Sequence, residues 1–185
     1  MNIEKIENGF TNIIDIGKYS VFVYTKKDGV SVKFDDIYEQ AQYYNSVVIT
    51  GDECLLQREE VCKLLKKLVN TNNNIQIQLH TNGLFTPLYF NDYKDNIVCY
   101  IYINLNNKKQ LNEQISTLSL KFYIDIHSKF IFIINDKEQL NEVENVVNIF
   151  SIKRKDVYIK LLNNTKENIE EIKYRKYNIA IEVEW

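Results

Sequence analysis

The sequence alternates short apolar runs with amphipathic segments, and this alternation constrains the fold more than any other feature. Residues 46–50 and 75–79 are rich in β-forming side chains, whereas residues 34–44 and 57–69 place apolar side chains at helical spacing. Strands that alternate with helices are typical of a mostly parallel sheet, because a parallel pair of strands needs a crossover connection. The sequence therefore predicts an α/β fold.

The same pattern continues to the end of the chain. The further strands that we expect are residues 97–103, 121–126, 130–134, 157–161 and 178–185, and the further helices are residues 136–150 and 166–172. No linker or internal repeat interrupts this series. We therefore expect residues 1–185 to form one domain.

A β-hairpin is predicted near the N-terminus. Residues 12–16 and 19–24 favour strands, and Gly17 and Lys18 between them make a two-residue connection of the kind that closes a hairpin. Residues 19–24 are the richer in β-forming side chains. They are the expected first strand of the core.

Charge and hydropathy argue against several classes of function. The 23 basic and 25 acidic residues give a formal net charge of −2, without a long basic run to follow a phosphate backbone. Nucleic-acid binding is not expected, and Lys153, Arg154 and Lys155 are interpreted as a solvated turn. The sequence has neither signal-peptide features nor an apolar run near the roughly 20 residues of a membrane span. We expect a cytoplasmic protein that does not contact a membrane.

The cysteines and histidines mark no metal centre. Cys54, Cys62 and Cys99 are odd in number and lack C-x-x-C spacing, which argues against a disulfide framework and a structural zinc site. Reduced thiols in or near the core are the expected state. His80 and His127 are the only histidines, and the sequence marks no partners for either.

Three segments together resemble one enzyme family. Residues 47–57 read V-V-I-T-G-D-E-C-L-L-Q and resemble the V-x-x-T-G-G-E-P-L-L-Q motif of the 7-carboxy-7-deazaguanine synthases, which are radical S-adenosylmethionine enzymes. Residues 81–83 resemble the T-N-G of the family's E-T-N-G, and residues 129–136 resemble its K-F-V-I-x-D strand ending. The resemblance covers most of residues 1–172 and implies a radical-SAM-like partial (β/α) barrel of mostly parallel strands.

The resemblance breaks at the residues that carry the family's chemistry. After the first core strand such enzymes have C-x3-C-x2-C, whose thiolates hold a four-iron four-sulfur cluster. Residues 25–32 read T-K-K-D-G-V-S-V instead, a short turn without cysteine or histidine. The family's substrate segments are replaced at residues 7–10 and 104–109. We therefore expect neither an iron–sulfur cluster nor radical chemistry.

The resemblance also implies a remnant cofactor site. In the family, the loop after the strand helps to seat the amino-acid end of S-adenosylmethionine. The matching residues here are Thr50, Gly51, Asp52 and Glu53 after one strand and Thr81, Asn82 and Gly83 after the next. Asp52 replaces the motif's second glycine and adds a Cβ where the backbone needs a positive φ or a close approach to the cofactor. S-adenosylmethionine is thus at most a remnant ligand, and no other cofactor is expected.

Three functions remain open. The leading hypothesis is a degenerate, non-catalytic relative of the 7-carboxy-7-deazaguanine synthases that acts as a binding or scaffold protein. The second is a ligand-binding module that keeps a pocket for S-adenosylmethionine or a purine-like molecule. The third is a non-radical enzyme that uses Asp52, Glu53 or His80, although alternation along the chain turns the two acids to different faces. The resemblance implies a homodimer, and the expected closing strand at residues 178–185 is a candidate contact.

Overall fold

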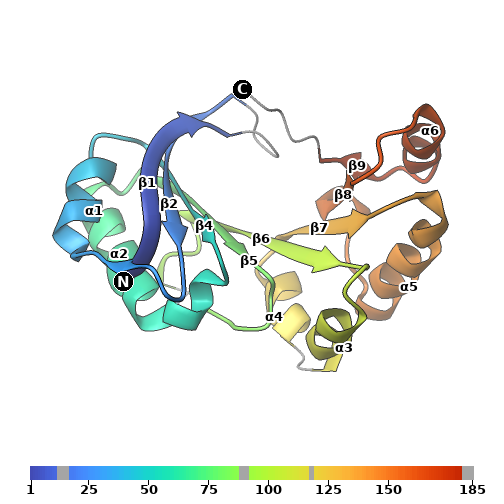
Figure 1. The fold of residues 1–185 in the computed structure, drawn as a ribbon, viewed down its shortest axis with the longest axis horizontal. Coiled ribbons are helices and arrows are strands. Elements are labelled where there is room, and N and C mark those ends of the chain that lie inside the picture. Colours follow the sequence, from blue (N-terminus) through green and yellow to red (C-terminus); the bar gives the residue numbers. More distant parts are fainter. Residues whose placement is uncertain (12–16, 88–91, 117–118, 181–185) are drawn as a thin grey trace. The chain divides into compact units, whose positions relative to one another are not determined.

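The computed structural model describes residues 1–11, 17–87, 92–116 and 119–180. These residues pack as two compact units (Figure 1). The first combines Met1–Thr81 with Phe85–Cys99, and the second combines Asn82–Leu84 with the chain from Tyr100 onward. No helix in the described ranges is long and apolar enough to cross a membrane.

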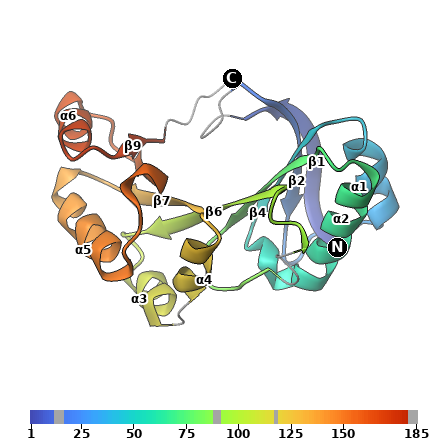
Figure 2. The same ribbon diagram turned by 180° about the vertical axis from the view of Figure 1, so that it is seen from behind.

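The first unit contains an antiparallel hairpin joined to parallel strands. Its strand order is β3-β1-β2-β4-β5. The bounds are β1 (Asn2–Phe10), β2 (Tyr19–Thr25), β3 (Val30–Ser31), β4 (Ser46–Gly51) and β5 (Gln76–Thr81). β1 runs antiparallel to β2 and β3, whereas β2, β4 and β5 run parallel. The crossovers are α1 (Phe34–Ala41) and α2 (Arg58–Thr71), which contact each other (Figure 2).

The central strand β4 shows why this part of the fold could be predicted. Val47, Val48 and Ile49 are fully buried, so both faces of the strand are covered. A parallel strand covered on both faces has a continuous apolar run rather than an alternating one. On α2, Leu64 and Leu68 are buried four residues apart, as an amphipathic crossover helix requires.

The second unit consists of parallel strands and their crossover helices. Its strand order is β6-β7-β8-β9, and each neighbouring pair is parallel. The strands are β6 (Ile97–Asn104), which belongs to this unit from Tyr100 onward, β7 (Lys129–Ile134), β8 (Val157–Leu161) and β9 (Asn178–Ile179). The helices are α3 (Lys108–Ser116), α4 (Ser119–Asp125), α5 (Leu140–Phe150) and α6 (Lys166–Tyr174). The strand order is linear in both units, so the sheet is open.

Three helices of the second unit end in the same way. After α4, α5 and α6 a residue with left-handed backbone is followed by a residue whose N–H reaches back five positions, which is the Schellman motif. The left-handed residues are His127 (φ 57°), Ser151 (φ 54°) and Lys176 (φ 61°). The amides that reach back belong to Ser128, Ile152 and Tyr177. All three of these side chains are buried.

The fold class is confirmed, but the hairpin differs from the prediction. Its first strand is β1, and Phe10 faces Tyr19 across the pair. The strand that pairs with β2 is therefore residues 2–10, which precede the predicted segment. The predicted strand at residues 12–16 lies outside the described residues. The pattern concealed β1 because Ile3 is its one fully buried side chain.

The prediction of a strand at residues 121–126 is wrong, because residues 121–125 belong to the helix α4. Leu120 and Tyr123 are buried three positions apart, while Lys121 and Asp125 are exposed four positions apart, which is helical spacing. A short aromatic and β-branched run does not distinguish a strand from a buried helix. The helix α3 was not predicted. In the expected closing strand, Asn178–Ile179 is confirmed as β9, and residues 181–185 lie outside the described residues.

Candidate functional site

The end of β4 and the loop after it, residues 50–57, are together named the β4 loop, and its first residues are hydrogen-bonded to the end of β2. The Thr25 hydroxyl donates to the Thr50 carbonyl at 2.9 Å, and the Asp52 N–H donates to the Thr25 carbonyl at 3.0 Å. Gly51 lies between these bonds with φ +109°, and a Cβ there would stand 2.2 Å from the Thr25 oxygen. No other residue type fits at this position without moving backbone.

Asp52 is bonded to the turn that stands where the family has its cysteines. The Lys27 N–H donates to Asp52 Oδ2 at 3.3 Å. The turn closes on itself through a bond from the Gly29 N–H to the Lys26 carbonyl at 3.2 Å, and β3 follows at once. The left-handed backbone falls on Gly51 and not on Asp52, so the Asp52 Cβ is accommodated without strain.

Glu53 joins the β4 loop to the end of β5. Its Oε1 accepts from the Leu55 N–H at 2.9 Å and from the Thr81 hydroxyl at 2.7 Å. The first bond caps the short 3₁₀ helix Cys54–Gln57, and the second connects two neighbouring parallel strands. Asp52 thus points toward β2 and Glu53 toward β5, as alternation along the chain predicted.

Gln57, the last residue of the β4 loop, makes two hydrogen bonds to the first strand, β1. Its side-chain oxygen accepts from the Asn2 N–H at 2.6 Å, and its amide donates to the Asn2 carbonyl at 2.9 Å. The side chain therefore pairs with both peptide groups of one residue, as a neighbouring strand would. This role was not predicted, because nothing in the sequence connects Gln57 with residue 2.

His80 and Cys54 are held in their neutral forms. Burial lowers the pKa of His80 to about 4, so its imidazole is uncharged at pH 7. The His80 Nε2 lies 3.4 Å from the Gln78 side-chain oxygen. Cys54 donates from Sγ to the His80 carbonyl at 3.2 Å. Burial first, and then the charge of Glu53, raises the pKa of Cys54 well above its usual value.

The predicted site residues divide between the two units. Thr50, Gly51, Asp52, Glu53 and Thr81 belong to the first unit and are brought together there. The other two predicted residues, Asn82 and Gly83, belong to the second unit. There Asn82 Oδ1 accepts from the Leu84 N–H at 2.9 Å, and Gly83 has φ +75° with Ile101 2.7 Å from the place of a Cβ.

The residues present do not fit a cysteine-ligated iron–sulfur cluster. Cys54 is buried within the β4 loop, Cys62 is half-buried on α2 with a pKa raised by burial, and Cys99 is buried in β6. A cluster needs several thiolates directed at one point. Within the described ranges, no group of three or more histidine, cysteine, aspartate or glutamate side chains is placed to hold a metal ion.

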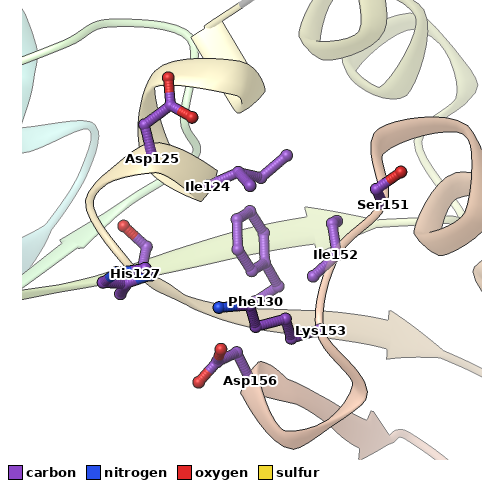
Figure 3. Close-up of a pocket in the computed structure, with 9 residues that line it drawn as sticks. Ile124, Asp125, His127, Phe130, Ser151, Ile152, Lys153 and Asp156 are labelled. Atoms are coloured by element: carbon purple, nitrogen blue, oxygen red, sulfur yellow. The ribbon is translucent and has the colours of Figure 1, made fainter.

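A pocket that the sequence did not predict lies in the second unit (Figure 3). It has a volume of about 260 Å³ and is here named the Ser128 pocket. Its lining comes from the segments that lead from α4 into β7 and from α5 into β8, where both helices end in left-handed residues. Nothing in the sequence marked these segments as a binding site, because a lone serine after a helix carries no sequence signal.

The open, mostly parallel α/β fold of this chain is similar to the fold of solved structures of SuiB, a radical S-adenosylmethionine enzyme. The chain resembles SuiB of Streptococcus suis bound to S-adenosylmethionine, with a TM-score of 0.55 and 14% identity over 86% of this chain and 46% of SuiB. A second structure of SuiB gives a TM-score of 0.52 and 14% identity over 87% of this chain and 45% of SuiB. The chain thus spans about half the length of SuiB. No protein-family profile and no curated protein sequence matches it.

Proposed function

We propose that this chain is a radical-SAM-like protein that performs no cluster chemistry and works by binding, as a degenerate relative of the 7-carboxy-7-deazaguanine synthases. One observation carries the proposal. The turn that stands in place of the cysteine segment is hydrogen-bonded to the β4 loop through Asp52. Asp52, which replaces the second glycine of the family motif, therefore stabilises the short turn that replaces the cysteine segment. The loss of the glycine and the loss of the cysteine segment are thus structurally linked.

The bonding on both sides of this turn supports the same proposal. Thr25, before the turn, is bonded to Thr50 and Asp52. Ser31, after the turn, pairs with Asn2 in the sheet. The segment is thus held between β1 and the β4 loop, and a cluster-bearing loop would have to break these contacts.

The hypothesis of a non-radical enzyme gains no support from the candidate residues. Asp52 bonds toward β2 and Glu53 toward β5, so the two carboxylates do not converge. His80 has a pKa of about 4, whereas an efficient general base at neutral pH has a pKa near 7. Binding remains the function that these contacts favour.

Anaerobic reconstitution with iron and sulfide tests the absence of a cluster. The matched control replaces all three cysteines (Cys54→Ala, Cys62→Ala and Cys99→Ala), with circular dichroism to verify its fold. We expect the same small amount of adventitious iron on both proteins. About four iron atoms per chain on the native protein, lost from the control, would overturn the proposal.

A second candidate function is the binding of S-adenosylmethionine or a purine-like molecule. The bond between Glu53 and Thr81 favours it, because it holds the ends of β4 and β5 together where parallel α/β proteins bind ligands. The SuiB structure bound to S-adenosylmethionine supports the choice of ligand. Calorimetric titration with S-adenosylmethionine, repeated with Glu53→Gln, tests it. Saturable binding that the variant weakens supports this function, and no binding at millimolar ligand contradicts it.

We also propose that the chain forms a homodimer and that it is a cytoplasmic protein. β9 is the last strand in the order of the second unit, and a strand at the edge of a sheet is usually covered by another chain or element. Light scattering of the full chain should give the mass of a dimer. A monomer at all concentrations would contradict this part of the proposal and leave the binding function unaffected.

A further inference from the structure

The Ser128 pocket has apolar walls at the edge of the second unit where its strands begin. Phe130 and Ile152 are 1% and 5% exposed, and Ile124 is half-buried beside them. Figure 3 shows the Phe130 ring between the Ile124 and Ile152 side chains. A pocket of about 260 Å³ is slightly smaller than typical drug-binding cavities, which begin near about 300 Å³. It has room for a molecule of one ring.

Ser128 is one of the residues that line this pocket, and its hydroxyl is buried. Its side chain is 1% exposed, and no hydrogen-bond partner of Oγ is present among the described residues. Ile152 and Tyr177 occupy the same position of the Schellman motif after α5 and α6, and both are large and mainly apolar. A buried hydroxyl without a partner is unfavourable by about 1–3 kcal/mol. The serine is thus an exception that a bound ligand would explain.

Among the described charged side chains around the pocket, the Lys153 ammonium is the one that no carboxylate neutralises. Asp156 is buried, and its carboxylate is paired with the Lys129 ammonium at 2.6 Å. Asp125 is exposed, and Figure 3 shows its carboxylate pointing away from the Phe130 ring. Lys153 lines the pocket, is exposed and pairs with none of the described carboxylates. A ligand would therefore meet one positive charge close to a hydroxyl and an apolar wall.

We infer that the Ser128 pocket binds a small organic anion that carries a carboxylate on a single flat ring. The Ser128 hydroxyl donates to the carboxylate, the Lys153 ammonium pairs with it, and the ring lies against Phe130. A nucleotide is too large for about 260 Å³, and inorganic phosphate would leave the apolar wall uncovered. This site is independent of the β4 loop and of the function proposed above.

The first experiment titrates the full chain with three probes while amide shifts are followed by NMR. Benzoate carries both features, benzamide has the ring without the charge, and inorganic phosphate has the charge without the ring. We expect saturable shifts for benzoate at residues 127–130 and 151–153, and affinity at least about tenfold weaker for the other two probes. No benzoate binding at millimolar concentration, or equal binding of phosphate, would overturn the inference.

The second experiment repeats the benzoate titration with variants. Ser128→Ala and Lys153→Met should each weaken binding by about tenfold, because each removes one partner of the carboxylate. Lys155→Met is the matched control, since Lys155 is exposed two positions further on and does not line the pocket. Its affinity should equal that of the native chain. Binding that neither Ser128→Ala nor Lys153→Met changes would place benzoate elsewhere and overturn the inference.

Discussion

The β4 loop and the Ser128 pocket differ in how far their polar groups are paired. In the β4 loop, Asp52, Glu53 and Gln57 all bond to other strands or turns of the first unit. In the pocket, the buried Ser128 hydroxyl has no partner among the described residues. The sequence predicted a site in the first region and none in the second. The motif therefore marks where this chain is held together, whereas an unpaired buried group marks where a ligand could bind.

The largest effect is expected from Gly51→Ala, which tests how tightly the β4 loop is fastened. The new Cβ would stand 2.2 Å from the Thr25 oxygen, on a backbone with φ +109°. Because backbone has to move, we expect the free energy of unfolding to fall by about 3 kcal/mol or more in urea denaturation.

Gly17→Ala is the matched control for this substitution. Gly17 also has a positive φ, +88°, but no atom lies within 4 Å of the place of its Cβ. The left-handed backbone alone should lower the free energy of unfolding by about 1 kcal/mol. If the two variants lose the same stability, the contact with Thr25 contributes nothing and the β4 loop is not tightly fastened.

The next effect concerns pH and His80, whose carbonyl accepts from the β4 loop at Cys54. The folded protein holds the pKa of His80 at about 4, below the usual 6.5, so the unfolded chain binds the proton more tightly. The resulting stability is fully present above pH 6.5 and is lost as the pH falls toward 4. Since the side chain is half-buried, we expect a loss of about 2 kcal/mol.

His80→Gln removes this titration and serves as the comparison. Its free energy of unfolding, subtracted from that of the native chain, should change by about 2 kcal/mol between about pH 7.5 and about pH 4. Denaturation at several pH values measures the difference. A constant difference over this range would show that His80 is as hydrated as in the unfolded chain.

The parts of the fold that the sequence predicted are those with a strong burial pattern. The strand at residues 46–50 was predicted because both faces of β4 are covered. β1 was missed because little of it is buried, and α4 was predicted as a strand because Phe122, Tyr123 and Ile124 favour strands as well as buried helices. The end of α5 at Phe150 agrees with the prediction. The Schellman motifs themselves were not predicted, because His127 and Ser151 take the left-handed position that glycine usually fills.

The candidate site was predicted in part for a related reason. Glu53 and Thr81 follow neighbouring parallel strands, so their contact follows from topology once the strands are known. The bond of Asp52 to Lys27 depends on a turn whose shape the sequence does not specify. The Ser128 hydroxyl has no sequence signature, because its isolation depends on every side chain packed around it.

A smaller loss of folding stability is expected from Gln57→Met, which removes two hydrogen bonds of the β4 loop while the volume of the side chain stays nearly constant. Both peptide groups of Asn2 lose their side-chain partner, so we expect about 1–2 kcal/mol less stability and faster hydrogen exchange at the Asn2 amide. Gln42→Met is the control, because the Gln42 amide makes one exposed bond to the Glu39 carbonyl. Equal losses in the two variants would contradict a special role for Gln57.

The smallest effect, and the one of opposite sign, is expected from Ser128→Ala. This change removes a buried hydroxyl without a partner, so the free energy of unfolding of the ligand-free chain should rise by about 0.5–1 kcal/mol. Thermal and urea denaturation measure it, with Ser119→Ala as a second serine of the same unit that is buried but has a partner. A loss of stability in Ser128→Ala would show that its hydroxyl is bonded in the folded protein, and the contrast between pocket and loop would disappear. A gain would place an unfavourable buried group at the one of these three Schellman positions whose residue is a serine that lines the Ser128 pocket, which is where a ligand could supply the missing hydrogen bond.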